Sequence, residues 1–140
     1  MERTLAILKP DSVAAGKAGA IIAKLQDEGF IVRGLKMLRL SQAQAQAFYE
    51  VHEARPFYGS LVEFMTSGPV IPLALERENA VAHLREVMGA TDVAKAAPGT
   101  VRNLFGSSIE RNAIHGSDSP ENAAIELSFF FSRAELLAAQ

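Results

Sequence analysis

The segment from Asn112 to Ser119 holds the side chains of this sequence that are best suited to chemistry. In it, His115 is followed by Gly116, Ser117 and Asp118, without apolar periodicity. A histidine in such a segment is predicted to lie on a loop, where the imidazole acts as a nucleophile or as an acid–base group. The serine hydroxyl can donate to a carboxylate or to a phosphate oxygen. The alternative is a structural or solvent-exposed histidine, because most single histidines in proteins have such a role.

Glu126 is the candidate partner of His115, one short predicted helix further along the chain. A carboxylate on one ring nitrogen would fix the tautomer and leave the other nitrogen free as the nucleophile. The remaining histidines, His52 and His83, lie in helical patterns among polar neighbours. A surface or structural role is predicted for both.

Three cationic side chains are placed where they could hold phosphates. Lys9 ends an apolar run directly before Pro10, and Arg85 and Arg102 bracket a long loop that contains Thr91. Arginine binds phosphate oxygens in a bidentate manner, so this cluster near a histidine favours a bound polyphosphate. The alternative is a set of solvated surface charges.

Tyr49 and Phe57 flank a break in the helical pattern at Arg55 and Pro56. Phe57 could therefore stand in a cleft as a stacking platform for a base, or both rings could close the core. No P-loop or dinucleotide-binding glycine motif occurs, and no cluster of acidic residues and histidines has metal-ligand spacing. Any Mg²⁺ is expected to arrive on substrate phosphates.

Composition sets the broad class. The chain has 140 residues, 49% of them hydrophobic, a net charge of −2 and no cysteine. These values fit one globular domain over residues 1–140 and exclude disulfides and thiolate metal sites. No apolar run reaches membrane-spanning length and no signal peptide is recognised, so we expect a soluble cytoplasmic protein that binds neither membranes nor nucleic acid.

The elements that must position these residues follow from hydrophobic periodicity and from caps. Strands are predicted over 4–8, 30–40, 70–75 and 126–131, and helices over 19–28, 42–51, 58–65 and 79–88, with a helical tail over 132–140. Ser41 and Asn79 are the predicted N-caps, and Pro72 is expected at a sheet edge or bulge. The order predicts an α+β fold with a ferredoxin-like βαββαβ core. It has a four-stranded antiparallel sheet, helices over one face and a long active-site loop at 90–102.

Taken together, these residues resemble nucleoside diphosphate kinases. The signature of that family, Asn-x-x-His-Gly-Ser-Asp, stands here as Asn112 to Asp118. The resemblance also covers segments 7–11, 61–69, 89–91 and 98–102 in the same order, and so extends over essentially the whole chain.

The resemblance implies a ferredoxin-like fold, use of Mg²⁺, and assembly as a homotetramer or homohexamer. It implies ping-pong transfer of a phosphoryl group between nucleoside triphosphates and diphosphates through a phosphohistidine at His115, oriented by Glu126 with Ser117 nearby. Lys9, Tyr49 and Asn112 would position the transferred phosphate or the sugar, and Arg85, Thr91 and Arg102 would hold the distal phosphates. Phe57 would stack on the base, with Ile109 on its other side.

Two positions depart from the family pattern. Leu104 stands where an aspartate is frequent, and Val93 where a proline is common. Both concern loop rigidity and subunit contacts. The sequence leaves three alternatives: a catalytically weak nucleotide-binding regulatory module of the same fold, a ferredoxin-like sensor or RNA-binding domain, and a phosphohistidine carrier in a signalling relay.

Overall fold

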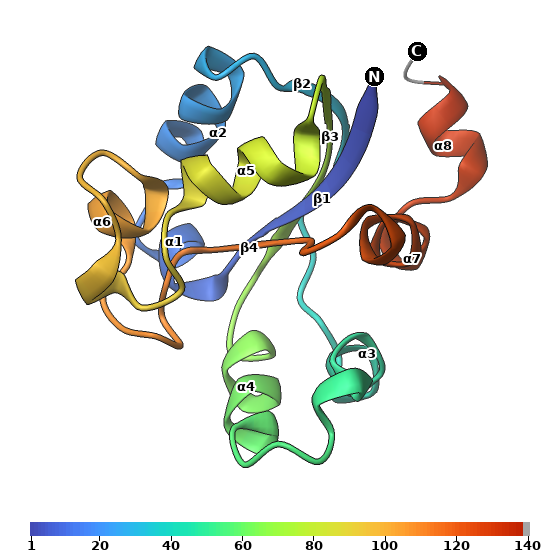
Figure 1. Ribbon diagram of the computed structural model, residues 1–140. Helices are drawn as coiled ribbons and strands as arrows, with labels where there is room; N and C mark the ends of the chain where they lie inside the picture. The colour runs from blue at the N-terminus through green and yellow to red at the C-terminus, as the bar shows by residue number, and fades with distance from the viewer. Residues whose placement is uncertain (139–140) are drawn as a thin grey trace.

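A four-stranded antiparallel sheet forms the centre of the computed structural model, which describes residues 1–138 (Figure 1). Its strands are β1 (Glu2–Leu8), β2 (Ile31–Leu35), β3 (Ile71–Arg77) and β4 (Ile114–Gly116), in the spatial order β2-β3-β1-β4. The predicted ferredoxin-like α+β fold is confirmed.

Helices cover both faces of this sheet, whereas the sequence suggested one. The reason lies in β1, where Leu5 and Ile7 point to one face, Ala6 and Leu8 point to the other, and all four are fully buried. Helices α2 (Ala18–Asp27) and α5 (Ala80–Met88) pack on the face of Ala6 and Leu8. Helices α3 (Gln42–Phe48), α4 (Tyr58–Met65) and α7 (Pro120–Phe130) pack on the other face.

The predicted strand over 126–131 is wrong, because this segment lies mostly in helix α7. Ser119 caps the helix by accepting a hydrogen bond from the backbone N–H of Asn122, and Pro120 occupies the first turn. Ala123, Leu127 and Phe130 are buried at helical spacing. The run of phenylalanines suggested a strand by propensity, but the cap and this spacing decide the structure. The fourth strand is instead the short β4, which contains His115.

Two smaller expectations also fail. Asn79 makes no side-chain cap; the Glu2 carboxylate accepts from the backbone N–H of Val81 at 2.7 Å in its place. Pro72 lies in the central strand β3, where its carbonyl accepts from the N–H of Lys36. Its missing N–H faces that same side, so the reciprocal bond to the Lys36 carbonyl is absent, at the point where regular pairing with β2 ends at Leu35.

The remaining described elements are short: α1 (Pro10–Ala14), η1 (Glu50–His52), η2 (Val93–Lys95), α6 (Val101–Phe105) and α8 (Arg133–Ala138). The predicted N-cap at Ser41 is confirmed, and it forms a capping box: its hydroxyl accepts from the N–H of Gln44, and the Gln44 side chain accepts from the N–H of Ser41. The predicted tail over 132–140 is helical up to Ala138, and its last two residues lie outside the described part.

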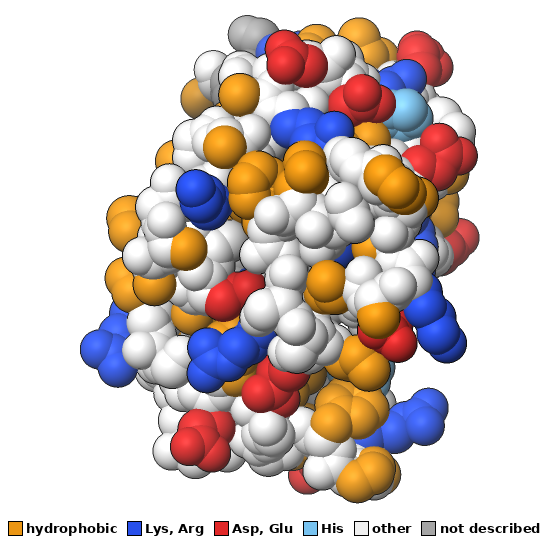
Figure 2. Space-filling view, turned by 90° about the vertical axis from the view of Figure 1, so that its left-hand side faces the viewer, with side chains coloured by type: hydrophobic (Ala, Val, Ile, Leu, Met, Phe, Trp, Pro, Cys, Tyr) orange, Lys and Arg blue, Asp and Glu red, His pale blue; other side chains and the backbone are white. Residues whose placement is uncertain are grey.

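The face on the α6 side of the molecule carries acidic, basic and apolar side chains interspersed with one another (Figure 2). Among residues 1–138, none of the helices combines the length and the apolar character needed to cross a bilayer.

Candidate active site

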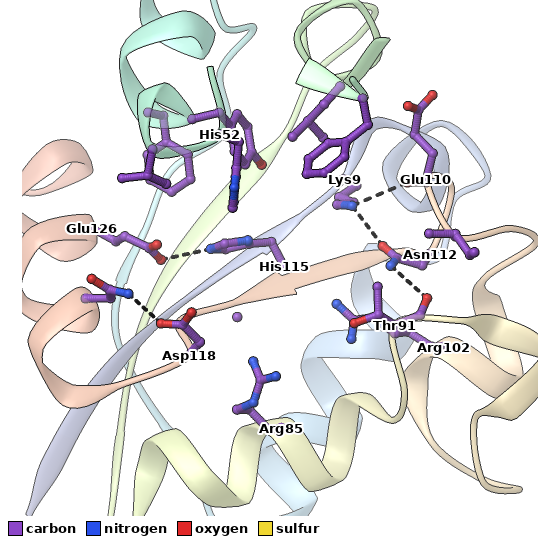
Figure 3. A pocket seen from close by; sticks show the side chains of 18 residues that line it. Lys9, His52, Arg85, Thr91, Arg102, Glu110, Asn112, His115, Asp118 and Glu126 are labelled. Carbon is purple, nitrogen blue, oxygen red and sulfur yellow. Dashed lines mark hydrogen bonds and ion pairs between the residues drawn. The ribbon is translucent and has the colours of Figure 1, made fainter. Parts of the chain in front are cut away.

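One pocket of about 540 Å³ gathers nearly all of the side chains predicted from the sequence (Figure 3). Nine of the ten predicted site residues line it: Lys9, Tyr49, Phe57, Arg85, Thr91, Arg102, Asn112, His115 and Glu126. The tenth, Ser117, is fully buried beside the pocket. The sequence therefore predicted a set of residues that the fold does bring together.

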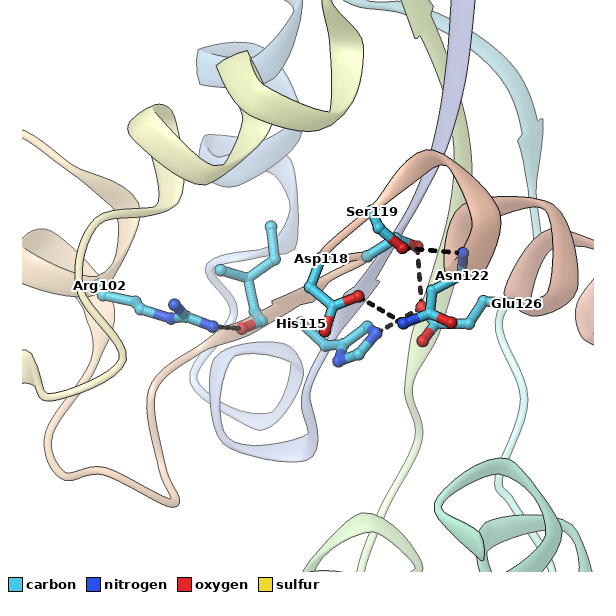
Figure 4. Close-up of polar contacts among 8 residues, drawn as sticks. Arg102, His115, Asp118, Ser119, Asn122 and Glu126 are labelled. Atoms are coloured by element: carbon cyan, nitrogen blue, oxygen red, sulfur yellow. Dashed lines mark hydrogen bonds and ion pairs between the residues drawn. The ribbon is translucent and has the colours of Figure 1, made fainter. Parts of the chain in front are cut away.

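His115 lies on β4 rather than on a loop, paired with Ile7 of β1. The side chain of Glu126, on α7, reaches the imidazole with 2.8 Å between Oε1 and Nε2 (Figure 4). Ser117 donates its hydroxyl hydrogen bond to the same Glu126 oxygen, also at 2.8 Å. An ionised carboxylate only accepts, so the Nε2 position carries the proton and Nδ1 is left with its lone pair.

The imidazole is also held by aromatic rings that the sequence did not single out. Phe48 meets the His115 ring edge to face, with 5.5 Å between centroids and 73° between planes. Phe48 in turn packs on Phe129 and Phe130 of α7. Helix α7 therefore fixes His115 twice, through the Glu126 carboxylate and through this aromatic packing. The only sequence signal was the position of Phe48 directly before Tyr49.

Behind β4, Gly116 lies tightly against α5. A Cβ atom at Gly116 would be 2.8 Å from the sulfur of Met88 and 3.1 Å from Leu84. The absence of a side chain thus lets the strand that carries His115 pack directly on the helix.

At the centre of the pocket, Lys9 and Asn112 form a buried pair. The Lys9 ammonium donates to the Asn112 side-chain oxygen at 2.8 Å and to the Glu110 carbonyl at 3.3 Å. The Asn112 amide donates to the Thr91 carbonyl at 3.2 Å. Lys9 occupies the expected strand end, directly after β1 and before Pro10. These contacts join the N-terminal strand, the long loop and the segment before β4 around one ammonium group.

Arg102 lies on α6, and its guanidinium donates to the carbonyl oxygens of Gly89 and Ile114, at 3.0 and 2.8 Å. Arg85 comes from α5 and lines the same pocket. Burial, with Arg85 nearby, lowers the pKa of Arg102 to about 10. Burial first, and Arg102 second, lower the pKa of Lys9 to about 8. This crowding of positive charge is typical of a site that binds an anion.

Two buried polar atoms of pocket residues have no hydrogen-bond partner within the described part of the chain, namely the Tyr49 hydroxyl oxygen and the Arg102 Nε. Burial raises the pKa of Tyr49, and the charge of Glu126 adds to the effect, so the hydroxyl stays protonated. Unsatisfied buried polar groups are costly, so these two favour a polar ligand in the pocket.

The far end of the pocket is apolar. Phe57, Leu61 and Ile109 line it, and the side chains of Phe57 and Ile109 are 46% and 60% exposed. His52 lies beside Phe57, with 5.5 Å between ring centroids. Exposed apolar groups facing one cavity suit a flat apolar surface such as a base.

The carboxylates at the pocket do not form a metal cage. Glu126 bonds to His115, Asp118 accepts from Asn122 at 2.6 Å, and Glu110 accepts from Ser60. Among residues 1–138, no group of three or more acidic or histidine side chains is arranged to hold a metal ion. The donors present therefore fit a cation that is bound mainly by phosphates.

A ferredoxin-like sheet that presents a carboxylate-bound histidine to a cationic pocket is an arrangement suited to a phosphotransfer enzyme. Comparison with known sequences agrees: the sequence profile of nucleoside diphosphate kinase matches residues 2–136. This chain belongs to the nucleoside diphosphate kinase family.

Individual relatives are similar over nearly their full length. The nucleoside diphosphate kinase of Chloroherpeton thalassium is 59% identical over 99% of this chain and 98% of its own. That of Chlamydia abortus is 56% identical, over 98% and 97%. Among solved structures, the Aquifex aeolicus enzyme has a TM-score of 0.93 at 47% identity, covering 96% of this chain and 97% of its own. The Halobacterium salinarum enzyme in complex with CDP has a TM-score of 0.92 at 40% identity, covering 96% and 90%.

Proposed function

We propose that this protein transfers the terminal phosphoryl group of a nucleoside triphosphate to a nucleoside diphosphate through a phosphohistidine at His115. The observation that carries the proposal is the bond between Nε2 and Glu126, which leaves Nδ1 as the nucleophile in a pocket lined by Lys9, Arg85 and Arg102. This family and site favour an enzyme over a catalytically weak regulatory module.

The transfer balances without any further reactant. Nδ1 of His115 forms a bond to the γ-phosphorus while the bond from that phosphorus to the bridging oxygen breaks, and the nucleoside diphosphate leaves with the electron pair. Glu126 keeps the proton on Nε2 and stabilises the positive charge that develops on the ring. A second diphosphate then attacks the phosphohistidine, which restores His115 and gives ping-pong kinetics.

The cationic residues hold the phosphates in this scheme. Arg85, Thr91 and Arg102 contact the distal phosphates, and Lys9, Tyr49 and Asn112 position the transferred group or the sugar. The orphaned Tyr49 hydroxyl and Arg102 Nε support this assignment, because both atoms need a polar partner in the pocket. Ser117 touches no substrate and acts through Glu126.

Phe57 and Ile109 receive the base. A stacking contact involves the π-face, which all bases have, so little base selectivity is expected. The Halobacterium salinarum relative in complex with CDP supports a nucleotide in the pocket of this chain as well.

Mg²⁺ is the proposed cofactor, carried by the nucleotide phosphates. When bound, it neutralises negative charge on the phosphoryl oxygens. The acidic side chains of the pocket are engaged with protein partners, as their hydrogen bonds indicate, so the chain itself supplies mainly cationic and amide groups to the phosphates.

We further propose that the chain is a single domain over residues 1–140, that it works in the cytoplasm, and that it assembles as a homotetramer or homohexamer. Leu104, which is 54% exposed, and Val93 in η2 are the positions where its loop and subunit contacts would differ from those of relatives. Light scattering on the purified protein decides between the two assemblies.

The experiment that tests the function is labelling with a nucleoside triphosphate that carries a radioactive γ-phosphate. We expect an acid-labile, base-stable phosphoprotein whose label leaves when an unlabelled nucleoside diphosphate is added. The variant His115→Asn should take up no label. Equal labelling of that variant, or a label that diphosphates do not remove, would contradict the proposal.

A further inference from the structure

The apolar end of the pocket is built from two walls that belong to different parts of the chain. Phe57 is the residue directly before α4, and Leu61 lies in the first turns of that helix. Ile109 comes from the segment between α6 and β4. The distance between these walls determines how much space a base has. The two walls are far apart in the sequence, so the chain connection between them does not fix that distance.

A hydrogen bond ties the walls together next to the residues that form them. The Ser60 hydroxyl, on α4 one turn after Phe57, donates to Glu110 Oε2 at 2.7 Å. Glu110 is the neighbour of Ile109. The bond therefore joins positions within one turn and one residue of the two apolar walls.

A second contact continues the same seam along α4. The guanidinium of Arg111 lies over the Phe64 ring, 5.0 Å from its centroid, and Phe64 is one turn beyond Ser60. Glu110 and Arg111 thus contact Ser60 and Phe64 in order, beside the pocket that Phe57 and Ile109 line. A cation–π contact of this kind adds to the hydrogen bond without occupying the pocket.

The same segment is connected to the phosphate end. The Glu110 carbonyl accepts from the Lys9 ammonium, and the backbone N–H of Arg111 donates to the Ser108 hydroxyl at 3.0 Å. Figure 3 shows Glu110 beside Lys9 and Asn112 at this side of the pocket. Glu110 therefore links α4 to the groups that hold the phosphates.

Helices α3 and α4 lie as a pair at one end of the sheet (Figure 1), and the Ser60–Glu110 bond joins α4 to the segment before β4. When the two walls of a binding site are already held in place, less conformational entropy is lost on ligand binding, and such preorganisation improves affinity.

We propose that Ser60 and Glu110 are positioning residues. They hold the two apolar walls of the pocket, which would enclose the base, at a fixed spacing before the nucleotide binds. The inference rests on the proposed function. It predicts that the pair contributes to binding of nucleotides and leaves the reactivity of His115 itself unaffected.

The test compares Ser60→Ala, Glu110→Ala and the double variant with the wild-type protein. Binding of a nucleoside diphosphate is measured by calorimetry, and His115 phosphorylation is measured with phosphoramidate. This donor has no base: the phosphorus–nitrogen bond to ammonia breaks as the bond to the imidazole forms. Each single variant should weaken nucleotide binding by about three- to tenfold, and the double variant no further. Phosphoramidate labelling should stay within about twofold of the wild-type rate.

Two further variants separate positioning from general stability. Ser60→Thr keeps a hydroxyl and should recover most of the lost affinity. Ser128→Ala removes a helix-surface hydroxyl that donates to the Ile125 carbonyl of its own helix, and should leave binding unchanged. Unchanged nucleotide affinity in Ser60→Ala and Glu110→Ala, or an equal loss of phosphoramidate labelling, would overturn the inference. A wild-type protein that binds nucleotides but takes no label from any triphosphate would overturn the proposed function instead.

Discussion

At the scale of single residues, the unusual property of the site is the burial of positive charge. Lys9 and Arg102 are each only 7% exposed and lie close enough for Arg102 to lower the pKa of Lys9. Such an arrangement is unfavourable without an anion and favourable with one, so the phosphates of a substrate complete it electrostatically.

The pH dependence of binding follows from Lys9. Its pKa of about 8 means that the ammonium is charged below that pH and loses its proton above it. Nucleoside diphosphate affinity should therefore fall by about tenfold or more as the pH rises past this value, since a hydrogen bond from a charged group is lost. Calorimetric titration at a series of pH values measures this. Lys9→Gln should bind weakly at every pH without that decline, and a flat wild-type profile would contradict the assignment.

The same shift has the opposite sign for stability. The folded-state pKa of Lys9 lies below the ordinary lysine value of 10.5, so the folded protein binds fewer protons than the unfolded chain between about pH 8 and pH 10.5. The contribution of Lys9 to the free energy of unfolding is therefore least favourable below about pH 8 and improves as the pH rises through that window.

Ser117 acts through Glu126, and its removal should show this. Ser117→Ala takes away a hydrogen bond to the oxygen that also holds His115, so His115 phosphorylation should slow by about tenfold, or about 1.4 kcal/mol in the barrier. Glu126→Gln should slow it further, and the double variant should be less than additive. Ser119→Ala is the matched control: it removes the cap of α7, costs about 1 kcal/mol of stability, and should leave the rate nearly intact.

At the scale of elements, the junction between α5 and α6 positions Arg102, one of the two arginines that line the pocket. Gly89 ends α5 with φ 85° and ψ 179°, a conformation that is essentially restricted to glycine. A Cβ atom there would be 2.7 Å from Cβ of Thr100, which caps α6. The carbonyl of Gly89 also accepts a hydrogen bond from Arg102. This glycine therefore determines both the turn after α5 and the position of the Arg102 guanidinium.

Gly89→Ala should therefore lower the free energy of unfolding by about 1–3 kcal/mol and weaken nucleotide binding at the same time. Denaturant unfolding and calorimetry measure the two effects. Gly19→Ala is the control, because a Cβ at that helical position meets nothing within 4 Å and should be neutral or slightly stabilising. A Gly89→Ala protein with normal stability would show that the backbone relaxes there.

The sequence predicted some of the secondary-structure elements correctly and others wrongly. The Ser41 cap and the periodic helices were predictable because the signals are local. The strand assigned to 126–131 failed because three phenylalanines have high strand propensity, and burial at Ala123 and Leu127 overrode it. Residues that lie far apart in the sequence, such as Ser60 and Glu110, met through tertiary packing, for which one sequence carries no signal.

At the scale of the whole molecule, the pocket draws on both layers around the sheet. Arg85 comes from α5 on one face, whereas Glu126 comes from α7 on the other, and His115 lies on the strand between them. The site therefore exists only when both cores are formed, and a ligand that fills it should stabilise the entire fold rather than one segment.

A nucleoside diphosphate at about one hundred times its dissociation constant should raise the free energy of unfolding by about 2.7 kcal/mol. Thermal or denaturant unfolding at several ligand concentrations measures this. His115→Asn keeps the cationic groups, so it should show a similar stabilisation while being inactive. If the ligand left the unfolding transition of the wild-type protein unchanged, the pocket would not be its binding site.

The close packing of Gly116 on Met88 has a consequence for oxidation. The chain contains no cysteine and four methionines, so methionine sulfur is its principal target for oxidants. Met1 and Met37 are 74% and 60% exposed, whereas Met65 and Met88 are buried, at 0% and 1%. A sulfoxide oxygen on Met88 would have to fit against the strand that carries His115. Peroxide should thus modify the two exposed sulfurs without harm, and inactivation should proceed only as fast as the regions around the buried sulfurs open.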